Sequence, residues 1–151
     1  MRTCIALYEH LGDIARIERA SYHPELVTSL AGFTKILEST GDLGELMVAL
    51  SKRGDVLGFA HYSFAEPRVL SLFDLAVDPG KRSKGVGKLL LKRIIRIAGE
   101  RKRKVVRLHV PQENIAALSL YLRHGFRAVS KLDKYYPGER DGWVLERKLE
   151  R

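Results

Sequence analysis

The sequence is short of the residues that would cross-link it or place it in a membrane. Cys4 is the only cysteine in 151 residues, which excludes an internal disulfide framework and fits a reducing compartment such as the cytoplasm. No apolar run is long enough to span a bilayer, and the amino terminus lacks the apolar region of a signal peptide. No repeat, linker or low-complexity segment interrupts the chain. We therefore expect one cytoplasmic domain over residues 1–151, with no membrane segment.

Acidic residues are also in the minority. The chain has 27 Lys and Arg against 18 Asp and Glu, which gives a net charge of +9 and an isoelectric point near 9.8. Such a charge suits acidic partners, namely coenzyme phosphates, nucleic acid or an acidic peptide. The one continuous charge run, Arg101–Lys104, falls where a helix should end, and cations are favoured at that end of a helix. We expect a structural role for this run, with docking to a ribosome or nucleic acid as the alternative.

Hydrophobic periodicity predicts strands that alternate with helices. Strands are expected at about 3–8, 45–50, 56–64, 69–77, 105–110, 127–132 and 143–149, and helices at about 11–20, 30–39, 85–100 and 114–124. The segment 69–110 should form a parallel strand–helix–strand crossover. The pattern predicts an α/β fold with a single mixed sheet of about seven strands, flanked by about four helices.

Two glycines and two cations follow the expected central strand at 69–77. Glycines let the backbone approach an anion, and the helix that follows aims its unpaired N–H groups at it. Gly80 and Gly85 have the spacing of a nucleotide-binding P-loop, but the Lys and Ser/Thr that this motif needs after its second glycine are missing. A dinucleotide motif opened by Gly85 and Gly87 would require a third glycine at Leu90. The segment therefore predicts a phosphate site of another kind.

The segment Arg82–Gly87, RSKGVG, resembles the Arg/Gln-x-x-Gly-x-Gly/Ala motif of the GNAT acetyltransferases, which bind the pyrophosphate of coenzyme A there. About thirty residues on, the order strand, Asn114–Ala117, Tyr121 and Gly125–Phe126 is similar to the second half of the same superfamily's core. Asn114 is the only asparagine of the chain and a good helix N-cap. The resemblance runs from about 16 to 149. It implies the GNAT fold, a splayed central strand that binds the coenzyme, and acetyl-CoA as cofactor.

Three further segments resemble the branch of the superfamily that acetylates protein N-termini, including the ribosomal-protein alanine acetyltransferases. They are 16–24, 72–79 (LFDLAVDP) and 133–137 (DKYYP). The resemblance implies transfer of acetyl to the N-terminal α-amine of a protein, with association with the ribosome as a further expectation and no requirement for nucleic acid. Acceptance of lysine side chains, polyamines or other small amines stays open, as does a non-catalytic module that binds RNA or the ribosome. The sequence leaves the preferred first residues and the oligomeric state undetermined.

The resemblance also assigns roles to residues. The expected coenzyme-binding residues are Leu75, Ala76, Val77, Arg82, Ser83, Lys84, Gly85, Val86, Gly87, Lys88, Asn114, Ala116 and Tyr121. Tyr121 is the candidate acid that protonates the departing thiolate. A backbone N–H near Leu75 is the candidate for stabilising the developing oxyanion.

His109 is the candidate base, because imidazole takes up a proton near neutral pH. The ribosomal-protein enzymes carry Glu at the matching position, whereas some other N-terminal acetyltransferases carry His there and Tyr where this chain has Ser71. Tyr22, Ser71, Tyr135 and Tyr136 are the candidate substrate-binding residues. The remaining histidines have no metal-ligand spacing. Cys4 has no base paired with it in sequence, so direct attack in a ternary complex is the expected scheme.

Overall fold

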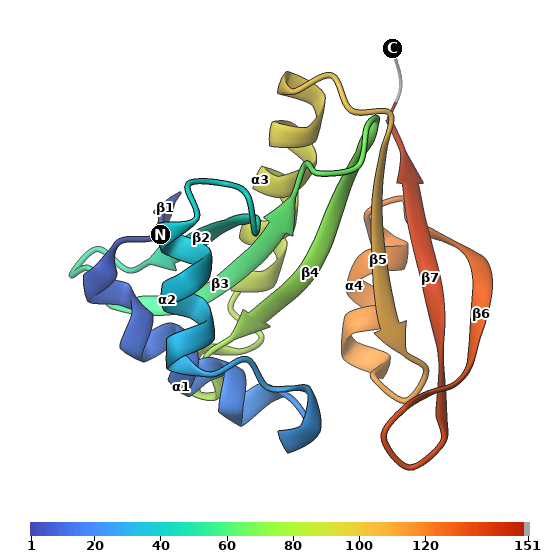
Figure 1. The fold of residues 1–151 in the computed structure, drawn as a ribbon, viewed down its shortest axis with the longest axis horizontal. Helices are drawn as coiled ribbons and strands as arrows, with labels where there is room; N and C mark the ends of the chain where they lie inside the picture. Colours follow the sequence, from blue (N-terminus) through green and yellow to red (C-terminus); the bar gives the residue numbers. More distant parts are fainter. Residues whose placement is uncertain (150–151) are drawn as a thin grey trace.

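The computed structural model describes residues 1–149 and holds one mixed seven-stranded sheet in the order β1-β2-β3-β4-β5-β7-β6 (Figure 1). The strands are β1 (Arg2–Ile5), β2 (Glu45–Leu50), β3 (Val56–Ser63), β4 (Val69–Val77), β5 (Val105–Pro111), β6 (Arg127–Tyr136) and β7 (Arg140–Lys148). The helices are α1 (Leu11–Ser21), α2 (Leu30–Glu38), α3 (Val86–Glu100) and α4 (Ile115–Arg123), with short 3-10 turns at Tyr8–His10, Pro24–Leu26 and Pro79–Lys81. The predicted fold is confirmed.

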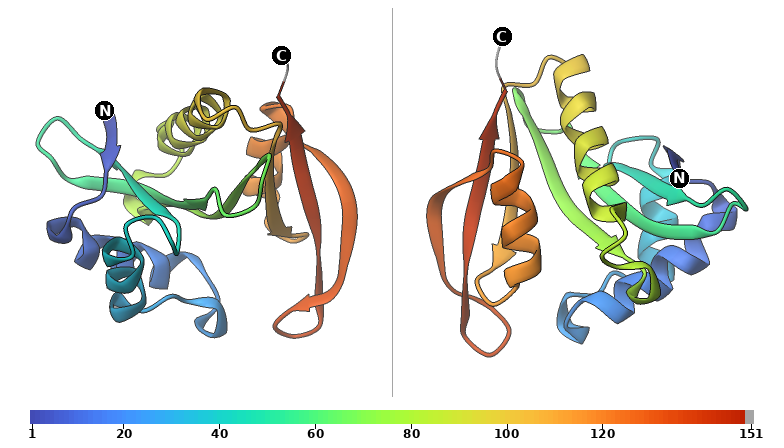
Figure 2. Two further views of the ribbon diagram at one scale, coloured as in Figure 1. Left: turned by 45° about the horizontal axis from the view of Figure 1, so that its top comes forward. Right: turned by 180° about the vertical axis from the view of Figure 1, so that it is seen from behind.

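The helices cover both faces of the sheet. Figure 2 shows α3 and α4 on one face and α1 and α2 on the other. Two apolar clusters fill the layers between helices and sheet, one beneath α3 and α4 and one beneath α1 and α2. The apolar stripe of α3 explains its place, because Val86, Leu90 and Ile94 are all buried against strands β2 to β5. The sheet is therefore a rigid frame between two packed layers.

The central strand splits the sheet along part of its length. Strands β4 and β5 are parallel, as the crossover predicts, and pair from Val69 with Val105 to Leu72 with Leu108. Beyond that point they diverge, as Figure 1 shows. On its other side β4 stays paired with β3 through Val77, past a register shift next to His61. The second half of β4 thus keeps one partner and leaves its β5 side open.

Element ends differ from the sequence expectation at two places. The β6–β7 hairpin extends the strands to Tyr136 and from Arg140, beyond the expected 127–132 and 143–149. Lys134 N–H donates to Asp141 Oδ1 across it at 2.8 Å, which supports the extension despite poor strand propensity. The first strand ends at Ile5 rather than near residue 8, because Tyr8–His10 turns into a 3-10 helix.

Half of the basic run 101–104 has a packing role. The Arg101 guanidinium lies 4.4 Å from the centroid of the Phe64 ring, and that of Arg103 lies 5.1 Å from it. Arg101 also pairs with Glu45 at 3.4 Å. These two cations fix the end of α3 to the end of β3. Within residues 1–149, no helix has the length and apolarity needed to cross a membrane.

Candidate active site

The turn between β4 and α3 has the backbone of an anion cradle. Gly85 caps α3 with φ of +83°, in the left-handed region, and a Cβ built on it would meet no atom within 4 Å. The first N–H groups of a helix have no partner within the helix, and at this end the helix dipole is positive. Arg82 and Lys88 flank the turn as cations. The predicted phosphate site therefore has the donors and the charge that a diphosphate requires.

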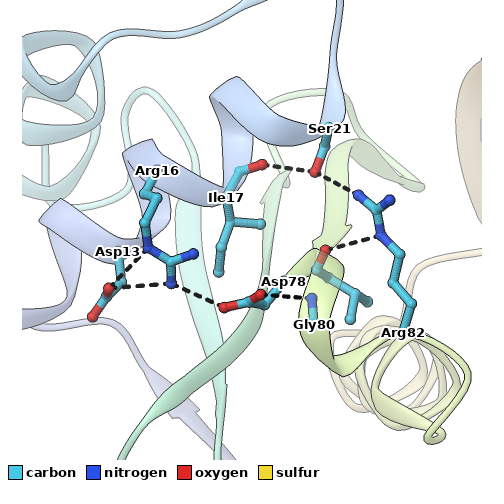
Figure 3. A network of polar contacts seen from close by, with 8 residues as sticks. Asp13, Arg16, Ile17, Ser21, Asp78, Gly80 and Arg82 are labelled. Carbon is cyan, nitrogen blue, oxygen red and sulfur yellow. Dashed lines mark hydrogen bonds and ion pairs between the residues drawn. The ribbon is translucent and has the colours of Figure 1, made fainter.

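A polar network ties the beginning of this turn to α1 (Figure 3). Asp78 Oδ1 accepts from Gly80 N–H at 2.9 Å, and Asp78 Oδ2 pairs with Arg16 at 3.0 Å. The Gly80 hydrogen bond, with a smaller contribution from Arg16, holds the pKa of Asp78 below its usual range. The turn is thereby held in place by α1 before any ligand binds.

Arg82 belongs to the same network. Its guanidinium donates to Val77 O and to Ser21 Oγ, both at 3.3 Å, and Ser21 in turn donates to Ile17 O at 2.7 Å. Figure 3 shows the Arg82 side chain reaching from the turn to the end of α1. This places a positive charge beside the last residue of β4.

A groove of about 810 Å³ runs from this turn along β4 to α4; we call it the β4–α3 groove. Its lining includes every expected coenzyme-binding residue except Lys84, together with residues from the end of α1 and from α4: Ser21, Tyr22, Leu75, Ala76, Val77, Arg82, Ser83, Gly85, Val86, Gly87, Lys88, Asn114, Ala116, Ala117, Leu120, Tyr121, Arg123 and His124. Lys84 is exposed and lies outside this lining. The groove therefore joins the anion cradle to the open side of β4.

The open side of β4 offers backbone donors to the groove. Asp78 N–H donates to Leu57 O on β3 at 2.9 Å. Because N–H directions alternate along a strand, the N–H groups of Val77 and Leu75 point the other way, to the side that β5 has left. A chain of amides can pair with the Val77 N–H as an added strand would, and the Leu75 N–H is left for a second acceptor on the ligand. A long amide-bearing ligand with a diphosphate end therefore fits this groove.

A second cavity of about 570 Å³ adjoins the β4–α3 groove at Leu75 and Tyr121; we call it the β4–β5 cavity. All four expected substrate-binding residues line it, together with His109: its lining is Tyr22, Leu26, Thr28, His61, Glu66, Ser71, Leu72, Phe73, Asp74, Leu75, Arg107, Leu108, His109, Val110, Pro111, Asn114, Ala117, Tyr121, Tyr135 and Tyr136. The two tyrosines at the end of β6 differ in exposure, since Tyr135 is exposed and Tyr136 is buried. The Tyr136 ring packs on the backbone of Gly142, where a Cβ would collide with it.

The cavity and the groove share part of their walls. Tyr22, Leu75, Asn114, Ala117 and Tyr121 line both. The Tyr22 hydroxyl donates to Leu75 O at 3.2 Å, and the buried Tyr121 ring packs 5.6 Å from Phe126. A ligand in the groove and a ligand in the cavity would meet at this junction.

Two titratable side chains, Tyr121 at the junction and His109 in the β4–β5 cavity, have pKa values that suit proton transfer. Burial, followed by the nearby Asp74 charge, raises the pKa of Tyr121, so its hydroxyl keeps its proton at neutral pH. Burial and the positive charge of Arg107 lower the pKa of His109, so its imidazole is neutral at pH 7. The His109 ring is also held edge-to-face on Tyr135, with centroids 5.4 Å apart. One group can donate a proton and the other can accept one.

Asn114 has a structural task as well as a place at the junction. Its Oδ1 accepts from Ala117 N–H at 3.2 Å, which confirms it as the N-cap of α4. Because the side-chain oxygen is engaged by the helix, the amide N–H₂ is the part of Asn114 that is left for a ligand.

Sequence reasoning missed two carboxyl groups of this region. Asp74 lies inside the apolar run of β4 and lines the cavity, and Glu18 is buried behind it on α1. A signal was present, because Glu18 falls on the apolar stripe of α1 beside Ile14 and Ile17. A charged residue on a buried stripe indicates a polar partner inside the fold.

Comparisons with known proteins agree with this geometry. The acetyltransferase (GNAT) family pattern matches residues 5–126. A streptothricin acetyltransferase of Streptomyces lavendulae is 38% identical over 80 residues, which are 52% of this chain and 42% of that protein. The [ribosomal protein bS18]-alanine N-acetyltransferase of Escherichia coli K12 is 36% identical over 78 residues, 50% and 53% of the two chains. The matched region thus spans about half the length of these two curated relatives and about a quarter to a third of two others.

The fold is shared with solved structures over its full extent. The ribosomal-protein-alanine N-acetyltransferase of Brucella melitensis superposes with a TM-score of 0.86 over 99% of this chain and 100% of that one, at 23% identity. The family match covers most of the chain, and the cradle, the open side of β4 and the cations fit the family's coenzyme. The chain therefore belongs to the acetyltransferase (GNAT) family, whose coenzyme is acetyl-CoA.

Proposed function

We propose that the enzyme acetylates the N-terminal α-amine of proteins or peptides. The observation that carries this proposal is the β4–β5 cavity, with Tyr22 on one side and Tyr135 and Tyr136 on the other. Its volume of about 570 Å³ lies within the range of roughly 300–1,000 Å³ of sites that enclose ligands the size of a short peptide segment. An extended chain end that enters between these rings would present its first amine to the junction with the groove.

His109 in the cavity and two residues of the junction, Leu75 and Tyr121, have roles in this proposal. Acetyl-CoA, when bound, supplies the acetyl group as an activated thioester. His109 takes the proton of the acceptor amine on its imidazole, which frees the nitrogen lone pair for attack. The Leu75 N–H, which points into the gap between β4 and β5, donates to the carbonyl oxygen as negative charge develops there. Tyr121 donates its hydroxyl proton to the departing sulfur, and its oxygen regains a proton from the nitrogen as the amide forms.

The chemistry of the acceptor supports an α-amine. At pH 7 about one α-amine in ten is neutral, against about one lysine side chain in a few thousand, given reference pKa values near 8 and 10.4. A neutral imidazole with a lowered pKa is a mild base, and it is better matched to the α-amine. A lysine acceptor would require a stronger base at this position.

Two similarities bear on the acceptor. The bS18-alanine relative and the Brucella structure carry names of enzymes that act on ribosomal protein. The streptothricin acetyltransferase, at 38% identity, favours a small-molecule amine as the second candidate. We give preference to the protein α-amine because three aromatic rings on two separate segments suit a chain that passes between them. Action in the cytoplasm and association with the ribosome belong to the same proposal.

The experiment is a thiol-release assay with acetyl-CoA and a panel of peptides that vary at the first two positions. Matched wells contain the same peptides with a blocked N-terminus, as well as lysine, polyamine and streptothricin acceptors. Release that depends on a free α-amine supports the proposal, and release confined to small amines contradicts it. A salt-dependent RNA-binding test in parallel detects the non-catalytic alternative, which predicts RNA binding without thiol release.

A further inference from the structure

Two carboxyl groups lie against each other between α1 and the second half of β4. Glu18 is 1% exposed, and its Oε2 accepts from Thr28 N–H at 3.0 Å. Its Oε1 is buried and meets no hydrogen-bond donor among the residues of known placement. The neighbouring side chain is Asp74, close enough for a hydrogen bond between the two carboxyl groups. Two carboxyl groups can bond to each other only if they share a proton.

The pair is anionic at neutral pH but does not carry two full charges. Burial, followed by the facing charge of Glu18, raises the pKa of Asp74 to about 8, and burial raises the pKa of Glu18 as well. The pair therefore holds one proton and one negative charge near pH 7. The other titratable groups around it are Tyr22 directly after α1, His61 from β3 and Tyr121 from α4, all of which are neutral there.

This negative charge opens onto the cavity and has no cation beside it. Asp74 lines the β4–β5 cavity, and it directly precedes Leu75, which lines both the cavity and the groove. Among the ion pairs found within residues 1–149, none includes Glu18 or Asp74. The other carboxylate of the cavity, Glu66, is paired with Arg107 at 3.1 Å, and Arg107 also pairs with Glu146. A largely buried charge that no cation neutralises is costly, so its presence indicates a cationic ligand.

We propose that the Glu18–Asp74 pair is the ammonium-binding subsite of the cavity and holds the protonated acceptor amine beside Leu75. Most of any aliphatic amine is protonated at pH 7, so the enzyme meets its acceptor as a cation. Asp74 accepts a hydrogen bond from the ammonium, and Glu18 holds the shared proton behind it. Proton removal is left to His109 on the β5 side of the cavity. The inference rests on acetyl transfer to an amine, but not on the acceptor being a peptide.

The alternative is that the pair only ties α1 to the sheet. Asp74→Asn separates the two roles, because the amide N–H₂ can still donate to Glu18 while the net negative charge at Asp74 is removed. A structural role predicts a change in the free energy of unfolding without a change in amine affinity. A binding role predicts a loss of amine affinity without a change in the free energy of unfolding.

The test compares Asp74→Asn with Glu66→Gln, which removes a carboxylate of the same cavity that is already paired. Steady-state kinetics at pH 7 use the best peptide acceptor and the best small primary amine of the panel. We expect the KM of each accepted amine to rise about tenfold or more in Asp74→Asn, with kcat within about threefold, and to change less in Glu66→Gln. Equal KM values in the two variants would overturn the inference. Should only small amines be acetylated, the peptide proposal fails while this comparison still decides the role of Asp74.

A second measurement requires no turnover. n-Butylammonium chloride is titrated into ¹⁵N-labelled enzyme, with tetramethylammonium chloride at the same ionic strength as the control that has no N–H donor. We expect a saturable shift of the Leu75 amide resonance in the wild type that Asp74→Asn abolishes and that Glu66→Gln retains. The same shift in the wild type and Asp74→Asn, or no shift in either, would contradict an ammonium site at this pair.

Discussion

Replacement of Gly85 by Asn and by Asp separates the effect of charge on coenzyme binding in the β4–α3 groove from the effect of side-chain size. A Cβ at Gly85 meets no atom within 4 Å, so both side chains have room. The φ of +83° strains any side chain, although Asn and Asp tolerate this region better than other residues. We expect each variant to lose about 1 kcal/mol of the free energy of unfolding.

The two variants differ by one negative charge at the first turn of α3. A carboxylate is favoured there by the helix dipole, so Gly85→Asp should be at least as stable to urea as Gly85→Asn. The same carboxylate opposes a diphosphate at the helix end. For charges about 6 Å apart at an effective dielectric constant of about 20, the repulsion is about 3 kcal/mol, or about 10²-fold in Kd.

The assay is calorimetric titration of acetyl-CoA into both variants, with urea unfolding to establish that they fold. We expect Gly85→Asp to bind acetyl-CoA about 10²-fold more weakly than Gly85→Asn. The ratio of the two Kd values should decrease as the salt concentration is raised. Equal Kd values in two folded variants would refute the placement of the diphosphate at this turn.

The remaining predictions concern the junction. Tyr121→Phe should lower kcat by about 10²- to 10⁴-fold with little change in the Kd of acetyl-CoA, because the ring keeps its packing on Phe126; wild-type turnover would end its role as the acid. The kcat/KM of the wild type should rise with pH through a midpoint below 6.5, since the pKa of His109 is lowered and the base must be unprotonated. His109→Ala should remove that rise, which an unchanged profile would contradict, and His109→Glu should restore part of the rate. Asn114→Ala should cost about 1 kcal/mol of unfolding free energy by loss of the α4 cap, measured in urea, whereas no loss would show that the cap is dispensable.

The fold was largely predictable because its signals are local. Residues 69–77 form an apolar run that ends at Asp78 and Pro79, and β4 has the same bounds. The stripe of α3 repeats at helical spacing for four turns. The extension of β6 to Tyr136 was not predictable, because it depends on Asp141 of the facing strand rather than on the residues of β6.

The parts of the candidate site also differ in whether their signal is local in the sequence. The turn at Arg82–Gly87 is one contiguous segment, so the spacing of its residues alone was enough to predict a phosphate site there. The Glu18–Asp74 pair joins a helix to a strand far along the chain, and although each residue lies in an apolar pattern, neither pattern names the other as its partner. Only the packing of α1 on the sheet brings them together and buries Glu18.

The central claim, transfer of acetyl to a protein N-terminal amine, is tested most directly with one peptide that offers both kinds of acceptor. The peptide has a free α-amine and one internal lysine, and fragmentation mass spectrometry locates the acetyl group after partial reaction at pH 7. We predict nearly all of the acetyl group on the α-amine, since its neutral fraction is about 200-fold larger than that of lysine. Acetyl found mainly on the lysine side chain, or on neither amine while a small amine is acetylated in the same tube, would contradict the claim.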